Sequence, residues 1–158
     1  MRKAFIHTLT QLARADKRVI LIVGDVGFSY IEDFAAMFPD QFINAGVTEQ
    51  TFIGMAAGLA LSGWKPYVYS MVPFVTMRNF EALRNDVCHN DANVKVIGVR
   101  GQTHYGFYGF SHNISDNEDV KILSHLPNLT LHLPETPEEV SRVVSETYQV
   151  AHPAYIRI

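Results

Sequence analysis

Ionisable side chains follow several of the short apolar runs in this sequence. Asp25 follows VILIV after one glycine, Glu49 follows a glycine-containing turn, and a later segment carries Arg100 and His112. Carboxylates and imidazoles transfer protons in proteins, and guanidinium groups bind anionic groups. Because ligands of open α/β sheets bind outside the carboxyl ends of the strands, we expect a binding or catalytic site at these positions.

Glu49 begins a segment that is otherwise small and apolar. It follows Gly46-Val47-Thr48 and precedes GMAAGLALSG, in which few other charges flank the carboxylate. A glutamate in the first turn of a helix gains about 0.3–1 kcal/mol from the helix dipole, and many such residues do only that. The small residues of the segment allow close packing, either on the chain's own sheet or against another chain.

Two other kinds of ligand site have little support in the spacing. Cys88, His89, His104 and His112 are scattered without the spacing of metal ligands. The segment Gly24-Asp25-Val26-Gly27 lacks the G-x-G-x-x-G spacing of a dinucleotide-binding turn. We therefore expect no metal site and no dinucleotide site in this chain.

The positions of the candidate residues depend on alternating helices and strands. Helical spacing of apolar residues predicts helices over 3–15, 31–38, 49–62, 74–87 and 137–150. Short β-branched runs predict strands over 19–23, 41–45, 67–71, 94–99, 129–133 and 154–158. This alternation predicts one three-layer α/β domain, with a mostly parallel sheet of about six strands and helices on both faces. We expect Thr48 to cap the helix of Glu49, and we expect 100–117 to be a long loop that is either functional or mobile.

The composition restricts the possible partners and location. Lys and Arg number 13 against 16 Asp and Glu, for a net charge of −3, without a long block of either sign. A nucleic-acid partner or a polybasic membrane patch is therefore not expected. The mainly apolar stretch from Phe52 to Leu61 is far shorter than the roughly 20 residues of a membrane span. The first residues lack the apolar centre of a signal peptide, and the single Cys88 fits a reducing compartment, so we expect a cytoplasmic protein.

Several ordered segments resemble the pyrimidine-binding domain of the transketolase family of thiamine diphosphate enzymes. They are GVTEQ at 46–50 with its small-residue helix, YVYSMVPFVTMRNFEALRNDV at 67–87, SHN at 111–113, LHLPETPEEV at 131–140 and PAYIRI at 153–158. The family includes transketolases, deoxyxylulose phosphate synthases and the beta subunits of 2-oxoacid dehydrogenases. The resemblance covers nearly the whole chain and implies the thiamine diphosphate-binding fold of pyrimidine type.

The resemblance implies cofactor-binding roles for several residues. Glu49 matches the family glutamate that contacts a ring nitrogen of the aminopyrimidine. A carboxyl group that shares a proton there favours the imino tautomer, whose exocyclic nitrogen can remove the thiazolium C2 proton. Phe74 matches the aromatic residue that stacks on the ring, and Met71 and Met77 occupy positions of further family aromatics. Asp25 matches an acidic position near the cofactor and the chain interface.

His112 and Arg100 are the expected substrate-binding residues. His112 ends the stretch Gly106 to His112, which matches the family's G-x-x-G-x-T-H substrate loop, so its imidazole is expected to donate to a substrate oxygen or move a proton. Where larger transketolases have an acidic residue and a second histidine, this sequence has Tyr108 and Arg100. Arg100 is therefore expected to meet an anionic substrate group.

The resemblance extends to only one of the two domains that bind the cofactor in this family. The other domain grips the diphosphate through a divalent metal and carries a Gly-Asp-Gly signature followed by an asparagine, which this sequence lacks. We expect residues 1–158 to form a pyrimidine-binding domain, with the diphosphate-binding and C-terminal domains absent from this chain. Thiamine diphosphate would be held here by its pyrimidine end, and Mg²⁺ would lie on a partner chain, in a dimer or heterotetramer.

The implied reaction is transfer of a two-carbon ketol unit between sugar-type substrates, a ketose and an aldose, by a chain that is inactive alone. The F-x-T-x-R stretch from Phe74 to Arg78 agrees best with the C-terminal subunits of split, short-chain transketolases. Two alternatives stay open. One is the beta-type component of a 2-oxoacid dehydrogenase, and the other is a non-catalytic regulatory or scaffold domain of the same fold.

Overall fold

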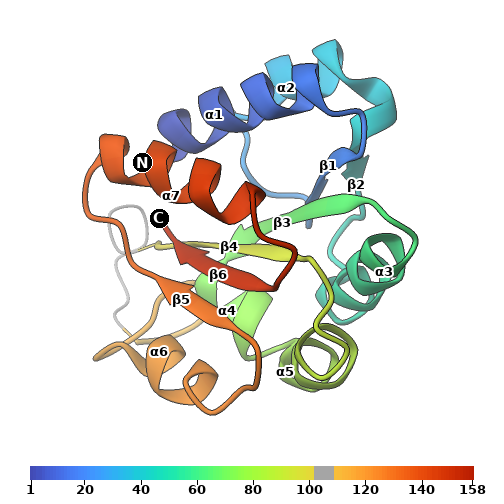
Figure 1. The fold of residues 1–158 in the computed structure, drawn as a ribbon. Helices are drawn as coiled ribbons and strands as arrows, with labels where there is room; N and C mark the ends of the chain where they lie inside the picture. Colours follow the sequence, from blue (N-terminus) through green and yellow to red (C-terminus); the bar gives the residue numbers. More distant parts are fainter. Residues whose placement is uncertain (102–108) are drawn as a thin grey trace.

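The computed structural model describes residues 1–101 and 109–158, in which six strands form one parallel sheet (Figure 1). The strands are β1 (Val19–Val23), β2 (Phe42–Asn44), β3 (Lys65–Met71), β4 (Lys95–Val99), β5 (Thr130–His132) and β6 (Ala154–Arg157). Their order is β2-β1-β3-β4-β6-β5, and each neighbouring pair is parallel. The predicted three-layer α/β fold is confirmed.

One face of the sheet is covered by helices from both ends of the chain. Helix α1 (Arg2–Ala15) packs beside α7 (Pro137–Tyr148), with the short α2 (Glu32–Met37) and the turn η1 (Pro39–Gln41) near α1 (Figure 1). Phe5 and Leu9 of α1 and Val144 of α7 are fully buried in the core of this layer. Helix α7 begins with a capping box, in which Thr136 and Glu139 bind each other's backbone N–H groups.

The opposite face is covered by α3 (Glu49–Leu61), α4 (Val72–Thr76), α5 (Phe80–Ala82), the π-helix η2 (Leu83–Cys88) and α6 (Glu118–Leu123). In α3, Ala56 and Ala57 are buried against the core of this layer, whereas the space around Gly58 is open and Leu61 is exposed. The small residues on one side of α3 thus pack against the chain's own sheet. The other side of the helix is not covered by this chain. In the part of the chain that the structure describes, none of the helices is both long enough and apolar enough to span a membrane.

The predicted continuous helix over 74–87 is wrong. The chain forms α4, then a turn at Met77–Asn79, and then α5 and η2. The N–H groups of Met77 and Arg78 both donate to the Pro73 carbonyl, and the Asn79 side-chain amide donates to the Phe74 carbonyl. The Met77 bond is a regular helical one, but the Arg78 bond to the same carbonyl and the Asn79 side-chain bond to the Phe74 carbonyl depart from the α-helical pattern, because side-chain amides can compete for backbone partners. Arg78 lies in this turn, and its guanidinium forms an ion pair with Glu49.

Two further local predictions need correction. Thr48 occupies the N-cap position of α3, but its hydroxyl donates to the Ala45 carbonyl and does not cap the helix. Helix α6 lies just after the predicted loop, where we expected no element. Its Asp119 is fully buried and accepts hydrogen bonds from the Tyr155 hydroxyl (2.7 Å) and the Arg157 guanidinium (2.9 Å) of β6. This tertiary anchor holds a helix of only one and a half turns, which local pattern does not reveal.

Candidate functional site

A cavity of about 780 Å³ lies at the carboxyl ends of β1 and β3. The sheet order places β2 on one side of β1 and β3 on the other. The connections therefore change direction between β1 and β3. Open α/β sheets bind ligands at such a point. The cavity is lined by Arg2, the turn from Gly24 to Tyr30, Val47, Glu49, Tyr69, Met71, Phe74, Arg78, Val99, Ser111 and His112.

Asp25 lies at the exposed rim of the cavity and is tied to the end of β2. Its backbone has a positive φ of 54°, which Asp tolerates better than most residues. The Asn44 side-chain amide donates to Asp25 Oδ1 and accepts from the Asp25 N–H, both at 3.1 Å, and it accepts from the Gly46 N–H at 3.0 Å. Asn44 therefore joins the turn after β1 to the turn that leads into Glu49.

Glu49 is placed by the tight turn that precedes α3. Gly46 has a φ of 69°, a conformation that a residue with a Cβ adopts only with strain. The turn directs Glu49 into the interior, where its side chain is 4% exposed although it also borders the cavity. Its Oε2 lies 2.8 Å from Nη1 of Arg78. The sheet connection thus presents a buried carboxylate beside open space, with a cation as its partner.

Phe74 lies next to this ion pair. The Arg78 guanidinium carbon lies 4.2 Å from the centre of the Phe74 ring, a distance typical of a cation on an aromatic face. The His112 ring is 4.9 Å from the Phe74 ring, in an edge-to-face arrangement. Met71 is 6% exposed and borders the cavity, whereas Met77 is 37% exposed and is not among the described lining residues.

His112 is held by contacts on both sides of its segment. Ser111 has a φ of 55°, and its hydroxyl lies 2.9 Å from His112 Nδ1. A Cβ at Gly101 would lie 2.8 Å from the His112 carbonyl oxygen and 2.9 Å from the Met71 methyl group, so glycine permits the close approach of these segments. Tyr108, which the sequence analysis singled out, and His104 lie outside the described residues.

The arginines that line the cavity, Arg2 and Arg78, differ from Arg100, which the sequence suggested. Arg100 is exposed, and it is not among the lining residues within the described ranges. Its carbonyl accepts from the Arg2 guanidinium (3.1 Å), and its N–H donates to the Ile158 carbonyl (2.9 Å). Arg2 itself lines the cavity, with its guanidinium 5.5 Å from the centre of the Tyr30 ring. The substrate-binding role of Arg100 stays a prediction without direct support from this geometry.

The electrostatics of the cavity combine buried and exposed groups. Burial raises the pKa of Tyr69 to about 12, so this hydroxyl stays neutral and can donate a hydrogen bond. The cations Arg2 and Arg78 and the carboxylates Asp25 and Glu49 border the same space. Over residues 1–101 and 109–158, no group of three or more His, Cys, Asp and Glu side chains is arranged to hold a metal ion.

The structure thus gathers Asp25, Glu49, Met71, Phe74 and His112 around one cavity. Sequence reasoning assigned no role to Arg78, although the F-x-T-x-R stretch that ends at this residue was a signal. It also missed Arg2 and Asn44, for which spacing offered no signal because their partners lie far away in the chain.

Comparisons with known proteins agree with this geometry. The family model described as "Transketolase, pyrimidine binding domain" matches residues 1–158. One of the subunits of an apulose-4-phosphate transketolase from Phocaeicola vulgatus is 34% identical over 158 residues, which are 99% of this chain and 50% of that protein. A putative transketolase C-terminal section from Methanocaldococcus jannaschii is 33% identical over 159 residues, which cover 100% of this chain and 50% of that protein. The chain thus spans about half the length of these curated relatives.

Another relative and two solved structures share the same region. 1-Deoxy-D-xylulose-5-phosphate synthase from Bacillus cereus is 33% identical over 152 residues, covering 90% of this chain and 22% of the synthase. A structure described as "Split gene transketolase, inactive beta4 tetramer" superposes with a TM-score of 0.86 at 30% identity, covering 99% of this chain and 50% of that one. Transketolase from Leishmania mexicana has the same fold, with a TM-score of 0.84 at 20% identity over 99% of this chain and 24% of that one.

Proposed function

Because this chain belongs to the family of transketolase pyrimidine-binding domains, we propose that it is the pyrimidine-binding part of a thiamine diphosphate-dependent, transketolase-like enzyme. The proposed reaction is transfer of a two-carbon ketol unit between sugar-type substrates. The names of the relatives support this reaction over 2-oxoacid oxidation or a scaffold role, since they describe parts of transketolases and a deoxyxylulose phosphate synthase.

The contacts of Glu49 and Phe74 carry the proposal. The buried carboxylate of Glu49 and the face of the Phe74 ring both contact one planar, nitrogen-containing group, the Arg78 guanidinium. An aminopyrimidine is also planar, and it offers ring nitrogens to a carboxyl group and a π face to an aromatic ring. The residues that line this cavity therefore fit the pyrimidine end of thiamine diphosphate.

Each lining residue would then have a separate task. When bound, the cofactor would supply the nucleophilic carbon that takes up the two-carbon unit and its electrons. Glu49 would share a proton with the ring nitrogen. Phe74 and Met71 would orient the ring, and Asp25 would border it from the turn after β1. His112, already oriented by Ser111, would donate to a substrate oxygen or move a proton.

The assembly belongs to the same proposal. Two of the relatives are named as one subunit and as a C-terminal section of a transketolase, which supports a split enzyme. We propose that a partner chain carries the diphosphate-binding domain and Mg²⁺, that the two chains form a dimer or heterotetramer, and that this chain alone is inactive. The cytoplasmic location and the limits of the domain stay predictions.

Isothermal titration of thiamine diphosphate with Mg²⁺, into this chain alone and into its complex with a diphosphate-domain chain, tests the proposal. We expect tight binding only in the complex, followed by ketol transfer from a ketose phosphate to an aldose phosphate. Tight binding by this chain alone would contradict the split site. A verified complex that does not bind the cofactor would favour a scaffold domain, and turnover of a 2-oxoacid in its place would identify the dehydrogenase component.

A further inference from the structure

Arg78 makes the same two contacts that the proposed function assigns to the aminopyrimidine ring. Its Nη1 lies 2.8 Å from Glu49 Oε2, and its guanidinium carbon lies 4.2 Å from the centre of the Phe74 ring. We propose that Arg78 competes with the cofactor, holding Glu49 and Phe74 before the ring binds and leaving both residues when it enters. This inference rests on the proposed function of the cavity.

The guanidinium of Arg78 occupies the space beside one oxygen of the carboxylate. The side chain of Glu49 is 4% exposed and borders both cavities, and its Oε2 forms an ion pair with Arg78 Nη1. A ring nitrogen that approaches Oε2 through the cavity would therefore have to replace Arg78 there.

The aromatic face poses the same requirement. A planar ring stacks on Phe74 with a spacing similar to that of the guanidinium, so the two groups exclude each other from one face. Guanidinium and aminopyrimidine are both flat groups that present nitrogens at their edges. Arg78 thus keeps the pyrimidine site formed and its carboxylate paired in the chain as the structure shows it.

Arg78 has space into which it can move. Its side chain is 43% exposed and projects from the Met77–Asn79 turn, where the helix is interrupted. A second cavity, of about 430 Å³, is bordered by Arg78 and Glu49 and adds Thr48, Gln50 and Thr51 at the start of α3. Rotation about the flexible arginine stem can carry the guanidinium from the first cavity into the second without a change in the backbone.

The competition predicts that removal of the guanidinium strengthens binding of the ring. If the pair is closed about nine tenths of the time, only a tenth of the molecules are ready to bind, and the apparent Kd is about tenfold weaker than the intrinsic one. The probe is 4-amino-2,5-dimethylpyrimidine, titrated into the ¹⁵N-labelled chain and followed by NMR. We expect Arg78→Met to lower its Kd about tenfold relative to the wild-type chain.

A matched control and a direct observation sharpen this test. Arg142, which pairs with Glu146 on the exposed side of α7, allows the same change far from the cavity, so Arg142→Met is expected to leave the Kd unchanged. In the wild-type chain, the side-chain NMR signal of Arg78 should move to the position of a solvated arginine when the probe saturates the site. This second measurement does not depend on the folding of any variant.

The outcomes separate this inference from the proposed function. Equal or weaker binding by Arg78→Met, or an Arg78 signal that does not move at saturation, would overturn the competition while leaving the pyrimidine site in place. Probe binding that is absent from the wild-type chain and from Arg78→Met, and absent also from the complexes of both with the diphosphate-domain chain, would overturn the pyrimidine site and the competition together. Titration of thiamine diphosphate with Mg²⁺ into the assembled complex should show the same order of affinities.

Discussion

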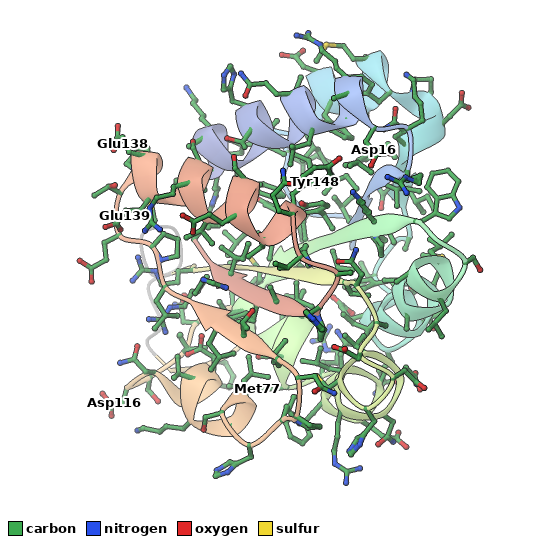
Figure 2. The ribbon with its side chains drawn as sticks, in the orientation of Figure 1. Asp16, Met77, Asp116, Glu138, Glu139 and Tyr148 are labelled. Carbon is green, nitrogen blue, oxygen red and sulfur yellow. The ribbon has the colours of Figure 1, made fainter. Side chains whose placement is uncertain are left out.

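The two ends of the sheet contain the same three kinds of side chain in different surroundings. At the carboxyl end, Glu49 pairs with Arg78, which lies on the Phe74 ring. At the amino end, Asp16 pairs with Lys65 (3.1 Å), whose ammonium lies 3.8 Å from the centre of the Tyr148 ring. Figure 2 shows Asp16 and Tyr148 close to each other, where α1 and α7 end. A carboxylate, a cation and an aromatic ring thus occur together twice.

The difference lies in how completely each carboxylate is bound. Asp16 accepts from the Arg18 guanidinium at two positions (2.9 Å), from the Arg18 N–H (3.0 Å) and from the Tyr148 hydroxyl (3.1 Å), in addition to Lys65. The Arg18 guanidinium contributes most to holding the pKa of Asp16 well below its usual range. Glu49 borders a cavity and forms its ion pair with Arg78 through Oε2. We infer that the saturated cluster around Asp16 serves stability and that the carboxylate of Glu49, which faces the cavity, serves binding.

The largest expected effect is on turnover. Glu49→Gln keeps the size of the side chain but removes the carboxyl group that shares a proton, so ketol transfer by the assembled enzyme should fall about 10²–10⁴-fold. Steady-state kinetics of the complex measures this loss. Circular dichroism should show an unchanged fold, and Glu138→Gln on the exposed start of α7 is the matched control. Full activity of the Glu49 variant would refute its catalytic role.

The corresponding change at the other end should affect stability and leave the cavity intact. Asp16→Ala removes several charge-assisted hydrogen bonds and leaves Lys65 without its carboxylate, so we expect a loss of about 2–3 kcal/mol in the free energy of unfolding. Urea denaturation measures it. Glu146→Ala, which breaks the exposed pair with Arg142, should cost only about 0.3–0.5 kcal/mol. Equal losses for both variants would remove the distinction between a saturated cluster and a surface pair.

A third cation provides a pH test at the amino end. Lys95 is 2% exposed, and its ammonium donates to Asn93 Oδ1 and to the carbonyls of Val150 and His152. Burial lowers its pKa to about 8 from 10.5. Between these values the unfolded chain binds more protons than the folded one, so the contribution of Lys95 to stability increases as the pH rises through this window.

The measurement compares the wild-type chain with Lys95→Met. Urea unfolding from pH 7 to 9.5 should show the wild-type chain gaining about 1–2 kcal/mol relative to the variant. Comparison between the two proteins cancels the contributions of other titrating groups, such as the tyrosines. A constant difference across this range would mean that Lys95 titrates alike in the folded and unfolded chains.

The smallest expected effect concerns ring stacking. Phe74→Leu keeps an apolar side chain at the cavity but removes the aromatic face, so the Kd of thiamine diphosphate in the assembled complex should rise about 3–10-fold, or about 0.6–1.4 kcal/mol. Calorimetric titration measures this change. Phe42→Leu, at a half-buried position of β2 that is not among the described lining residues, is the control. An unchanged Kd for the Phe74 variant would show that stacking contributes little to this site.

The sheet and the main helices could be predicted from the sequence because their signals are local. VILIV at 19–23 is a continuous apolar run and forms the buried β1, and the spacing of Phe5 and Leu9 predicted α1. The interruption at Asn79 and the short α6 were missed, because each depends on a side-chain hydrogen bond that spacing does not reveal.

The sequence by itself determined the fold class and, through ordered motifs, the family and the candidate residues Asp25, Glu49, Met71, Phe74 and His112. The tertiary structure decided which cations join them. Arg78, in the turn that interrupts the helix after β3, reaches Glu49, and Arg2 rather than Arg100 lines the cavity because α1 begins at the carboxyl end of the sheet. Periodicity and motifs describe residues that are neighbours along the chain. Contacts between charged side chains of different elements depend on how those elements pack.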